Sequence, residues 1–251
     1  MVKRDELVSY CDTLLDVAGF SDYCPNGLQV EGREEIRRIV SGVTASQALI
    51  DAAVAAEADL LLVHHGFFWK GEDARITGMK RRRIGALLAA DMNLLAYHLP
   101  LDAHPELGNN ARLARLLELP VSGHFGLPGG PALACWGELA EPLATEALME
   151  RLRVRLGHPP LHLGPRGPIR RLGWCTGAAQ SFIDAAADLG LDAFISGEVS
   201  EPTAHVAAER GIQFLAAGHH VTERHGPRAL GEHLARKFDL DHRFIDLYVP
   251  V

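Results

Sequence analysis

The chain has 251 residues, 47% of them hydrophobic and 23% charged, which is typical of a soluble globular protein and not of a disordered or coiled-coil one. The formal net charge of −7 gives no basic field, so a nucleic-acid partner is not favoured. Four cysteines without CxxC spacing predict neither a zinc knuckle nor a disulfide framework, and they favour a reducing compartment.

Residues 1–19 place charged and apolar side chains at helical spacing, without the apolar core of a signal peptide. No later stretch reaches the length of about 18 apolar residues that a membrane-spanning helix needs. We therefore expect a cytoplasmic protein that makes no membrane contact.

An internal repeat begins at residue 36. Residues 36–65 align without a gap on residues 169–198, and ten of the aligned positions are identical. Each copy consists of a short apolar strand, a turn of small residues, an Ala-rich helix and a second apolar strand. Strands of this kind, alternating with helices, predict a mostly parallel sheet that is covered on both faces. The repeat therefore predicts an α/β sandwich that is built twice.

The second strand of the first copy ends in "LLLVHHGFFWKG", residues 60–71. A single histidine at a strand end is more often a structural residue than a ligand, but two in tandem favour a metal site. Neighbouring side chains of a strand point to opposite faces, so His64 and His65 require either two ions or a turn at Gly66. Imidazole with carboxylate suits Zn, Mn, Fe, Co or Ni, and the lack of thiolates argues against a structural zinc site.

The likeness between the halves resumes further along the chain. "LLAYHLPLD" at 94–102 pairs with "LAAGHHVTE" at 215–223, which places His98 on His219 and Asp102 on Glu223. Ligands of open α/β sheets collect at the carboxyl ends of the strands, so these groups belong to comparable edges. A carboxylate can bridge two cations, which makes Asp102 and Glu223 the natural partners of the histidines.

The remaining segments complete the expected architecture. Residues 123–143 and 156–168 are rich in Gly and Pro and predict turns around short strands, with a helix between them. Residues 227–238 predict a helix, followed by a last strand. The predicted fold is α/β, with two duplicated α/β/α sandwich domains: the first covers residues 1–122 and is completed by 217–251, and the second covers 123–216.

Five blocks of sequence together resemble the Nif-three-like family of the YbgI type, whose members are described as GTP cyclohydrolase 1 type 2 homologues. The blocks are "PNGLQVEG" (25–32), "HHGFFW" (64–69), "YHLPLDAHPELGNN" (97–110), "SGEVSE" (196–201) and "GHHVTERHG" (218–226). The resemblance implies the Nif-three-like fold, a dinuclear metal site, and a homohexameric ring whose metal sites face its interior.

The resemblance also implies a set of ligands for two divalent metal ions per subunit, with Glu223 as the bridge. These ligands are His64, His65, Asp102, His219 and Glu223. The sequence has Gly66 and Phe67 where "HHPLFW" is commoner, which affects the shape of the loop beside the ligands. His98 is expected next to the ligands, either orienting one of them or acting as a proton shuttle.

Two hypotheses about function remain open at this point. In the first, the ion pair makes the protein a hydrolase of a small nucleotide-like or phosphorylated molecule, with His98 or His124 as the catalytic proton carrier. In the second, the ring is a non-catalytic metal-binding scaffold with a regulatory or interaction role. The aromatic residues 67–69 would line either the core or a subunit interface.

Overall fold

Two structural units make up the computed structural model, which describes residues 1–251. The first unit comprises Met1–Gly108 and Gly226–Leu247, and the second comprises Asn109–His225 and Tyr248–Val251. The predicted domain boundaries, at residues 122 and 217, differ from these. The reason is that the segments on either side of residues 123–216 bury Leu113 and Val221 in a core of the second unit.

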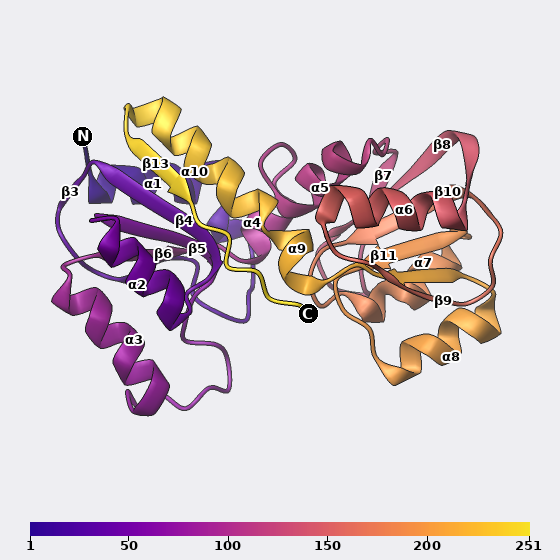
Figure 1. The fold of residues 1–251 in the computed structure, drawn as a ribbon, viewed down its shortest axis with the longest axis horizontal. Coiled ribbons are helices and arrows are strands. Elements are labelled where there is room, and N and C mark those ends of the chain that lie inside the picture. The colour runs from indigo at the N-terminus through magenta and orange to yellow at the C-terminus, as the bar shows by residue number, and fades with distance from the viewer. The chain divides into compact units, whose positions relative to one another are not determined.

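The first unit contains a five-stranded sheet in the order β13-β4-β5-β6-β2, in which only β2 is antiparallel to its neighbour, and a separate antiparallel pair of β1 and β3 (Figure 1, indigo, purple and yellow). Its elements are β1 (Val2–Lys3), α1 (Arg4–Leu14), η1 (Val17–Gly19), β2 (Gly27–Val30), β3 (Glu35–Ile36), β4 (Arg38–Thr44), α2 (Gln47–Ala55), β5 (Leu60–His65), α3 (Gly78–Ala89), β6 (Asn93–Ala96), α4 (Leu99–Ala103), α10 (His225–Phe238) and β13 (Asp241–Phe244).

The apolar run of strand β5 is continuous because helices cover both faces of the sheet. Leu60 and Leu62 pack with α1 and α10 on one face of the sheet. Leu61 and Val63 pack with α2 and α3 on the other face. Successive side chains of a strand alternate between faces, so a strand covered on both sides must be apolar at every position. The predicted α/β/α sandwich is confirmed in this unit.

The second unit contains a six-stranded sheet in the order β7-β8-β10-β11-β12-β9 (Figure 1, magenta to orange). Helices α5 and α6 pack on one face of it, and α7 and α8 on the other. Its elements are α5 (Asn109–Leu117), β7 (Gly123–Phe125), β8 (Ala134–Ala144), α6 (Thr145–Leu156), β9 (Leu161–Leu163), β10 (Pro168–Cys175), η2 (Gln180–Phe182), α7 (Ile183–Asp188), β11 (Ala193–Ser196), α8 (Glu201–Arg210), β12 (Gln213–Ala216) and α9 (His219–Glu223).

The strand registers of the two units confirm the duplication. Strand β4 pairs with β5 in parallel, with Ile39 opposite Leu60. Strand β10 pairs with β11 in parallel, with Leu172 opposite Ala193. These four residues occupy equivalent positions of the aligned copies, so the repeat in sequence is a repeat in hydrogen bonding as well.

The predicted alignment of residues 94–102 with residues 215–223 is wrong by one residue. Leu62 lies opposite Leu95 in the first unit, and Ile195 lies opposite Leu215 in the second, so Leu95 corresponds to Leu215. Counting on from there, His98 corresponds to Gly218, and these two residues are the N-caps of α4 and α9. His98 is therefore not the counterpart of His219, nor Asp102 that of Glu223. One residue along a helix turns a side chain by about 100°, so the two pairs face different directions.

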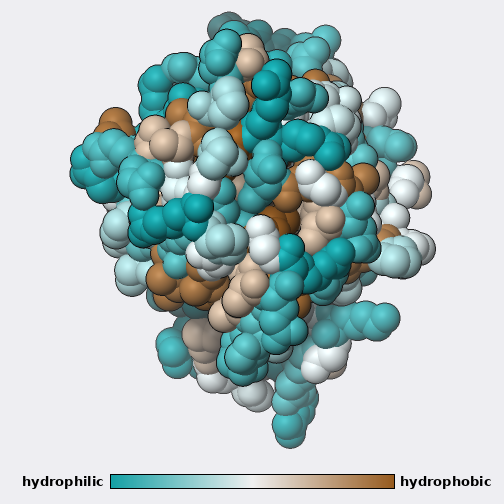
Figure 2. All heavy atoms as spheres, turned by 90° about the vertical axis from the view of Figure 1, so that its right-hand side faces the viewer, coloured by the Kyte–Doolittle hydropathy of each residue, from teal (hydrophilic) through white to brown (hydrophobic).

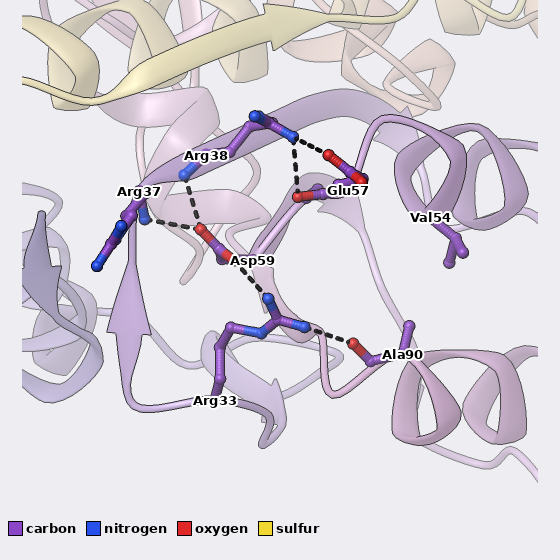
Figure 3. Close-up of a pocket in the computed structure, with 8 residues that line it drawn as sticks. Arg33, Arg37, Arg38, Val54, Glu57, Asp59 and Ala90 are labelled. Atoms are coloured by element: carbon purple, nitrogen blue, oxygen red, sulfur yellow. Dashed lines mark hydrogen bonds and ion pairs between the residues drawn. The ribbon is translucent and has the colours of Figure 1, made fainter.

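The amino ends of β4 and β5 are joined through Asp59, which lines a pocket of about 490 Å³ (Figure 3). Its Oδ2 accepts hydrogen bonds from the backbone N–H groups of Arg37 and Arg38, at 2.8 and 2.9 Å. In the second unit, Asp192 Oδ2 accepts the same two bonds from the equivalent backbone. The identical Arg-Arg and Asp positions of the repeat thus have a structural role, at the opposite end of β5 from His64.

Figure 2 shows a face on which apolar side chains form small separate groups among hydrophilic ones. None of the helices is long and apolar enough to cross a membrane.

We predict that Asp59→Ala lowers the free energy of unfolding by about 2 kcal/mol, because two backbone donors and the Arg33 guanidinium lose a buried charged acceptor. Urea unfolding measures this loss. Asp51→Ala is the matched control, since Asp51 lies in the same repeat but is exposed. It should change the free energy by less than about 0.5 kcal/mol. Equal losses in the two variants would contradict the structural role of Asp59.

Candidate metal centre

His64 lies at the carboxyl end of β5 and is fully buried. Its Nδ1 lies 2.8 Å from the carbonyl oxygen of Tyr97, and its Nε2 lies 3.5 Å from Asp102 Oδ1. A carbonyl oxygen can only accept, so Nδ1 carries a hydrogen, and in the neutral ring Nε2 is the nitrogen with the lone pair. His64 thus presents the tautomer that binds a metal through Nε2, beside a carboxylate.

His65 follows directly and is less buried. Its Nδ1 lies 3.1 Å from Thr44 Oγ1, at the end of the neighbouring strand. Although β5 remains extended through His65, the rings of His64 and His65 lie only 4.6 Å apart between centroids. The geometry therefore allows the two imidazoles to approach one ion as well as two.

His98 completes a group of three imidazoles in the first unit. One ring nitrogen of each of His64, His65 and His98 lies within 4.8 Å of the others. The Nδ1 of His98 lies 2.8 Å from the carboxylate of Asp22, a residue 76 positions earlier in the chain. No spacing rule in the sequence relates Asp22 to His98, so this contact was not predicted.

Asp102 is carried by the short helix α4, one turn after His98. Its backbone N–H donates to the His98 carbonyl oxygen at 3.1 Å, and its carboxylate is buried beside His64. The first unit thus brings together His64, His65 and Asp102 of the predicted ligands, with His98 next to them.

The second unit contributes His219 and Glu223, which lie four residues apart on α9 and so share one face of the helix. His219 Nε2 lies 2.9 Å from Glu223 Oε2, and its Nδ1 lies 2.7 Å from Glu198 Oε1. Burial alone would lower the pKa of His219, but the two carboxylates outweigh it and raise that pKa to about 9. Metal binding at Nε2 would therefore require His219 to lose a proton.

Glu198 is a second residue that sequence reasoning missed. It belongs to the "SGEVSE" block and occupies the repeat position of His65. A carboxylate that accepts the Nδ1–H of a metal-binding histidine fixes the ring and makes it a better ligand. The available signal was the aligned His65, which marks this strand end as part of the site.

Gly177 makes room for the candidate ligands of the second unit. It has a positive φ of 67°, and a Cβ added there would overlap Glu223 Oε1 and lie 3.2 Å from His219 Nε2. The equivalent residue of the first unit is Thr44, whose hydroxyl contacts His65. The same repeat position therefore orients an imidazole in one unit and admits a carboxylate in the other.

The aromatic residues after the histidines have separate roles. Phe67 is 5% exposed and packs in the core of its own unit. The ring of Trp69 lies 5.0 Å from that of His98 and 5.9 Å from that of His65. Phe68 is exposed, with Lys80 over its ring, and Trp69 is half-buried. Most of the aromatic surface that could have lined a subunit interface is therefore covered within the first unit.

Gly66 allows a close contact in the loop after β5. Gln29 Oε1 accepts a hydrogen bond from the N–H of Phe67 at 2.7 Å. A side chain at residue 66 would overlap this amide oxygen and crowd the Cβ of Ala96. The departure from the commoner "HHPLFW" thus has a local packing reason.

His124 lies apart from the candidate ligands of its own unit. It is exposed on β7, the edge strand, and three strands separate β7 from β12, which leads into α9. Strands of a sheet are spaced by about 4.8 Å, so His124 is on the order of 19 Å from that strand. This placement does not support a catalytic role beside His219 and Glu223.

The donor chemistry fits divalent transition metals. The ligand candidates are imidazole nitrogens and carboxylate oxygens, without thiolates, and each imidazole has a partner at Nδ1 that directs Nε2. This arrangement matches catalytic metal sites better than closed structural ones.

The model of a protein family described as Duf34/NIF3 (NGG1p interacting factor 3) matches residues 2–249. The chain belongs to the DUF34/NIF3 family. A family member from Pseudomonas aeruginosa, described as "GTP cyclohydrolase 1 type 2 homolog", is 56% identical over 245 residues, which cover 97% of each chain.

Two solved structures resemble this one over their whole length. The protein ybgI, described as of unknown function, has a TM-score of 0.94 and 54% identity, with 100% of both chains covered. TTHA1606 from Thermus thermophilus has a TM-score of 0.91 and 34% identity, also with 100% of both chains covered. The family and the fold expected from the five sequence blocks are thus confirmed.

We predict that Gly177→Ala greatly reduces metal retention, because the added methyl group displaces Glu223 and His219. Elemental analysis of the purified protein measures the loss. Gly157→Ala is the control, since Gly157 has a similar φ of 70° in the same unit and nothing within 4 Å of the added Cβ. Both variants should lose about 1 kcal/mol of stability from backbone strain, but only Gly177→Ala should lose metal. Unchanged metal in both would contradict this account of Gly177.

Proposed function

We propose that this protein is a metal-dependent hydrolase of a small nucleotide-like or phosphorylated molecule. The observation that supports this most is the group of imidazoles in the first unit: one ring nitrogen of each lies within 4.8 Å of the others, and Nε2 of His64 lies beside the buried carboxylate of Asp102. The description of the relatives as GTP cyclohydrolase 1 type 2 homologues supports a hydrolytic reaction on a nucleotide.

We further propose that two divalent ions bind to the five residues expected from the family resemblance. These are His64, His65, Asp102, His219 and Glu223. The support lies in the sequence motifs and in the local geometry of each group within its own unit. Bound ions of this kind would supply Lewis-acid chemistry, polarising an electrophile and making a water molecule more acidic.

The protein's own residues would then have distinct tasks. Asp102 and Glu223 are buried carboxylates that can hold positive charge, and Glu223 is the proposed bridge. Glu198 keeps the His219 ring in place through Nδ1. His98 is the proposed proton carrier, since one of its ring nitrogens lies within 4.8 Å of those of His64 and His65, and Asp22 at Nδ1 leaves Nε2 for proton transfer.

The assembly is a separate proposal. We propose that the protein forms a homohexameric ring and lies in the cytoplasm. The ring rests on the family resemblance, because the aromatic surface after His65, which could have indicated an interface, is mostly covered within its own unit. All four cysteines are free thiols, which fits a reducing compartment. Light scattering on the native protein should give a mass near six times 27.3 kDa. A mass of 27.3 kDa would refute the ring.

We predict about two equivalents of metal per chain, falling in both His65→Ala and Glu223→Ala, because each change removes a proposed ligand. A panel of nucleotides and phosphoesters, assayed with Mn, Zn, Fe and Ni, should reveal hydrolysis that Asp102→Asn reduces by about 100-fold or more. Full metal content in both alanine variants would refute the ligand set. Metal binding without turnover on any compound would favour the scaffold hypothesis instead.

A further inference from the structure

Asp22 lies in the loop before β2, outside the sequence motifs that contain the candidate ligands. Both of its carboxylate oxygens nevertheless have hydrogen-bond partners. Its side chain is 3% exposed. Oδ1 accepts from the N–H of Tyr23 at 2.6 Å and lies 2.8 Å from His98 Nδ1. Oδ2 accepts from the Asn26 side chain at 2.8 Å and from the N–H of Leu99 at 3.0 Å. Both carboxylate oxygens are therefore fully used.

The chemistry of these contacts determines the tautomer of His98. Burial alone would raise the pKa of Asp22, but the hydrogen bonds from His98 and Asn26 outweigh it and lower that pKa to about 2. An ionised carboxylate can only accept, so Nδ1 of His98 must be the donor. In the neutral ring Nε2 then carries the lone pair, and it is the nitrogen left to face His64 and His65.

The same loop also holds the backbone from which the ring projects. Asn26 Oδ1 accepts from the N–H of His98 at 2.7 Å, next to the bond from Leu99 to Asp22. The ring of Trp69, at 5.0 Å and nearly perpendicular, and that of Tyr23, at 6.4 Å, lie against the imidazole. A group held at its backbone, its ring faces and one nitrogen is oriented before any ligand arrives.

We infer that Asp22 is a positioning residue that holds His98 as the Nδ1–H tautomer and presents its Nε2 to the histidines at the end of β5. The consequence for catalysis, proton transfer through Nε2, rests on the proposed function. The tautomer itself does not.

The tautomer is observable in protein labelled with ¹⁵N-histidine, by long-range ¹H–¹⁵N correlation in the metal-free state. The His98 signals are assigned by their loss in His98→Gln. We expect a protonated Nδ1 and an unprotonated Nε2 in the native protein, and averaging between tautomers in Asp22→Asn. A native His98 with its hydrogen on Nε2 would overturn the inference, even if the variant does not fold. So would a pattern in Asp22→Asn that is the same as the native one.

Asp12→Asn is the matched control. Asp12 is a partly buried carboxylate that accepts a hydrogen bond from the hydroxyl of Tyr97 at 2.8 Å. Tyr97 directly precedes His98 in the sequence, but Asp12 does not contact the His98 imidazole. This variant should keep the native His98 signals and the native kcat. A change of the His98 tautomer in Asp12→Asn as large as in Asp22→Asn would reduce Asp22 to a general packing role and overturn the inference.

Kinetics adds a second readout. If the proposed hydrolysis is found, Asp22→Asn should lower kcat by about 100-fold and leave KM within about twofold, with an unchanged metal content. Loss of metal from Asp22→Asn, but not from Asp12→Asn, would make His98 a ligand and overturn its role as a positioned proton carrier. If no compound of the nucleotide and phosphoester panel is turned over, the proposed function is refuted, but the result on the His98 tautomer is unaffected.

Discussion

A hydrogen bond at Nδ1 is the interaction on which the candidate centre depends. A partner at Nδ1 fixes the tautomer and the orientation of an imidazole, so that Nε2 is placed to bind a metal or to move a proton. Every histidine of the site has such a partner, and the four partners are of three chemical kinds: a backbone carbonyl, a hydroxyl and two carboxylates. The pairs are His64 with the Tyr97 carbonyl, His65 with the Thr44 hydroxyl, His98 with the Asp22 carboxylate, and His219 with the Glu198 carboxylate.

These partners come from loops and strand ends that the α/β/α sandwich brings to one edge of each sheet. The strands themselves are apolar on both faces, so the polar side chains of the site stand only at the strand ends and in the loops that follow. Rigid strands therefore determine the backbone positions of His64 and His65, and the groups in the loops determine the orientation of the rings. The opposite edge is tied by Asp59 and Asp192 and serves stability instead.

The duplication explains both the likeness and the asymmetry of the two units. Strand pairing kept its register, because a shift by one residue would move every core side chain to the wrong face. The strand ends were not under that constraint and diverged. His65 in one unit corresponds to Glu198 in the other, and Thr44 corresponds to Gly177. One copy thus offers imidazoles, whereas the other offers the carboxylate of Glu198 and, at Gly177, the space that Glu223 occupies.

The sequence by itself determined the fold class, the repeat, the residue types of the site and its place at the carboxyl ends of the strands. The fold class follows from periodicity within single elements, where neighbours in sequence are neighbours in space, whereas the repeat follows from alignment of the two halves and the full ligand set from the family resemblance. The tertiary structure alone decided the one-residue offset of α9 relative to α4, the unit boundaries, and the roles of Asp22, Glu198 and Gly177. Each of these depends on the approach of segments distant in the chain, such as Asp22 and His98 at a separation of 76 residues, which packing sets and spacing along the chain does not encode.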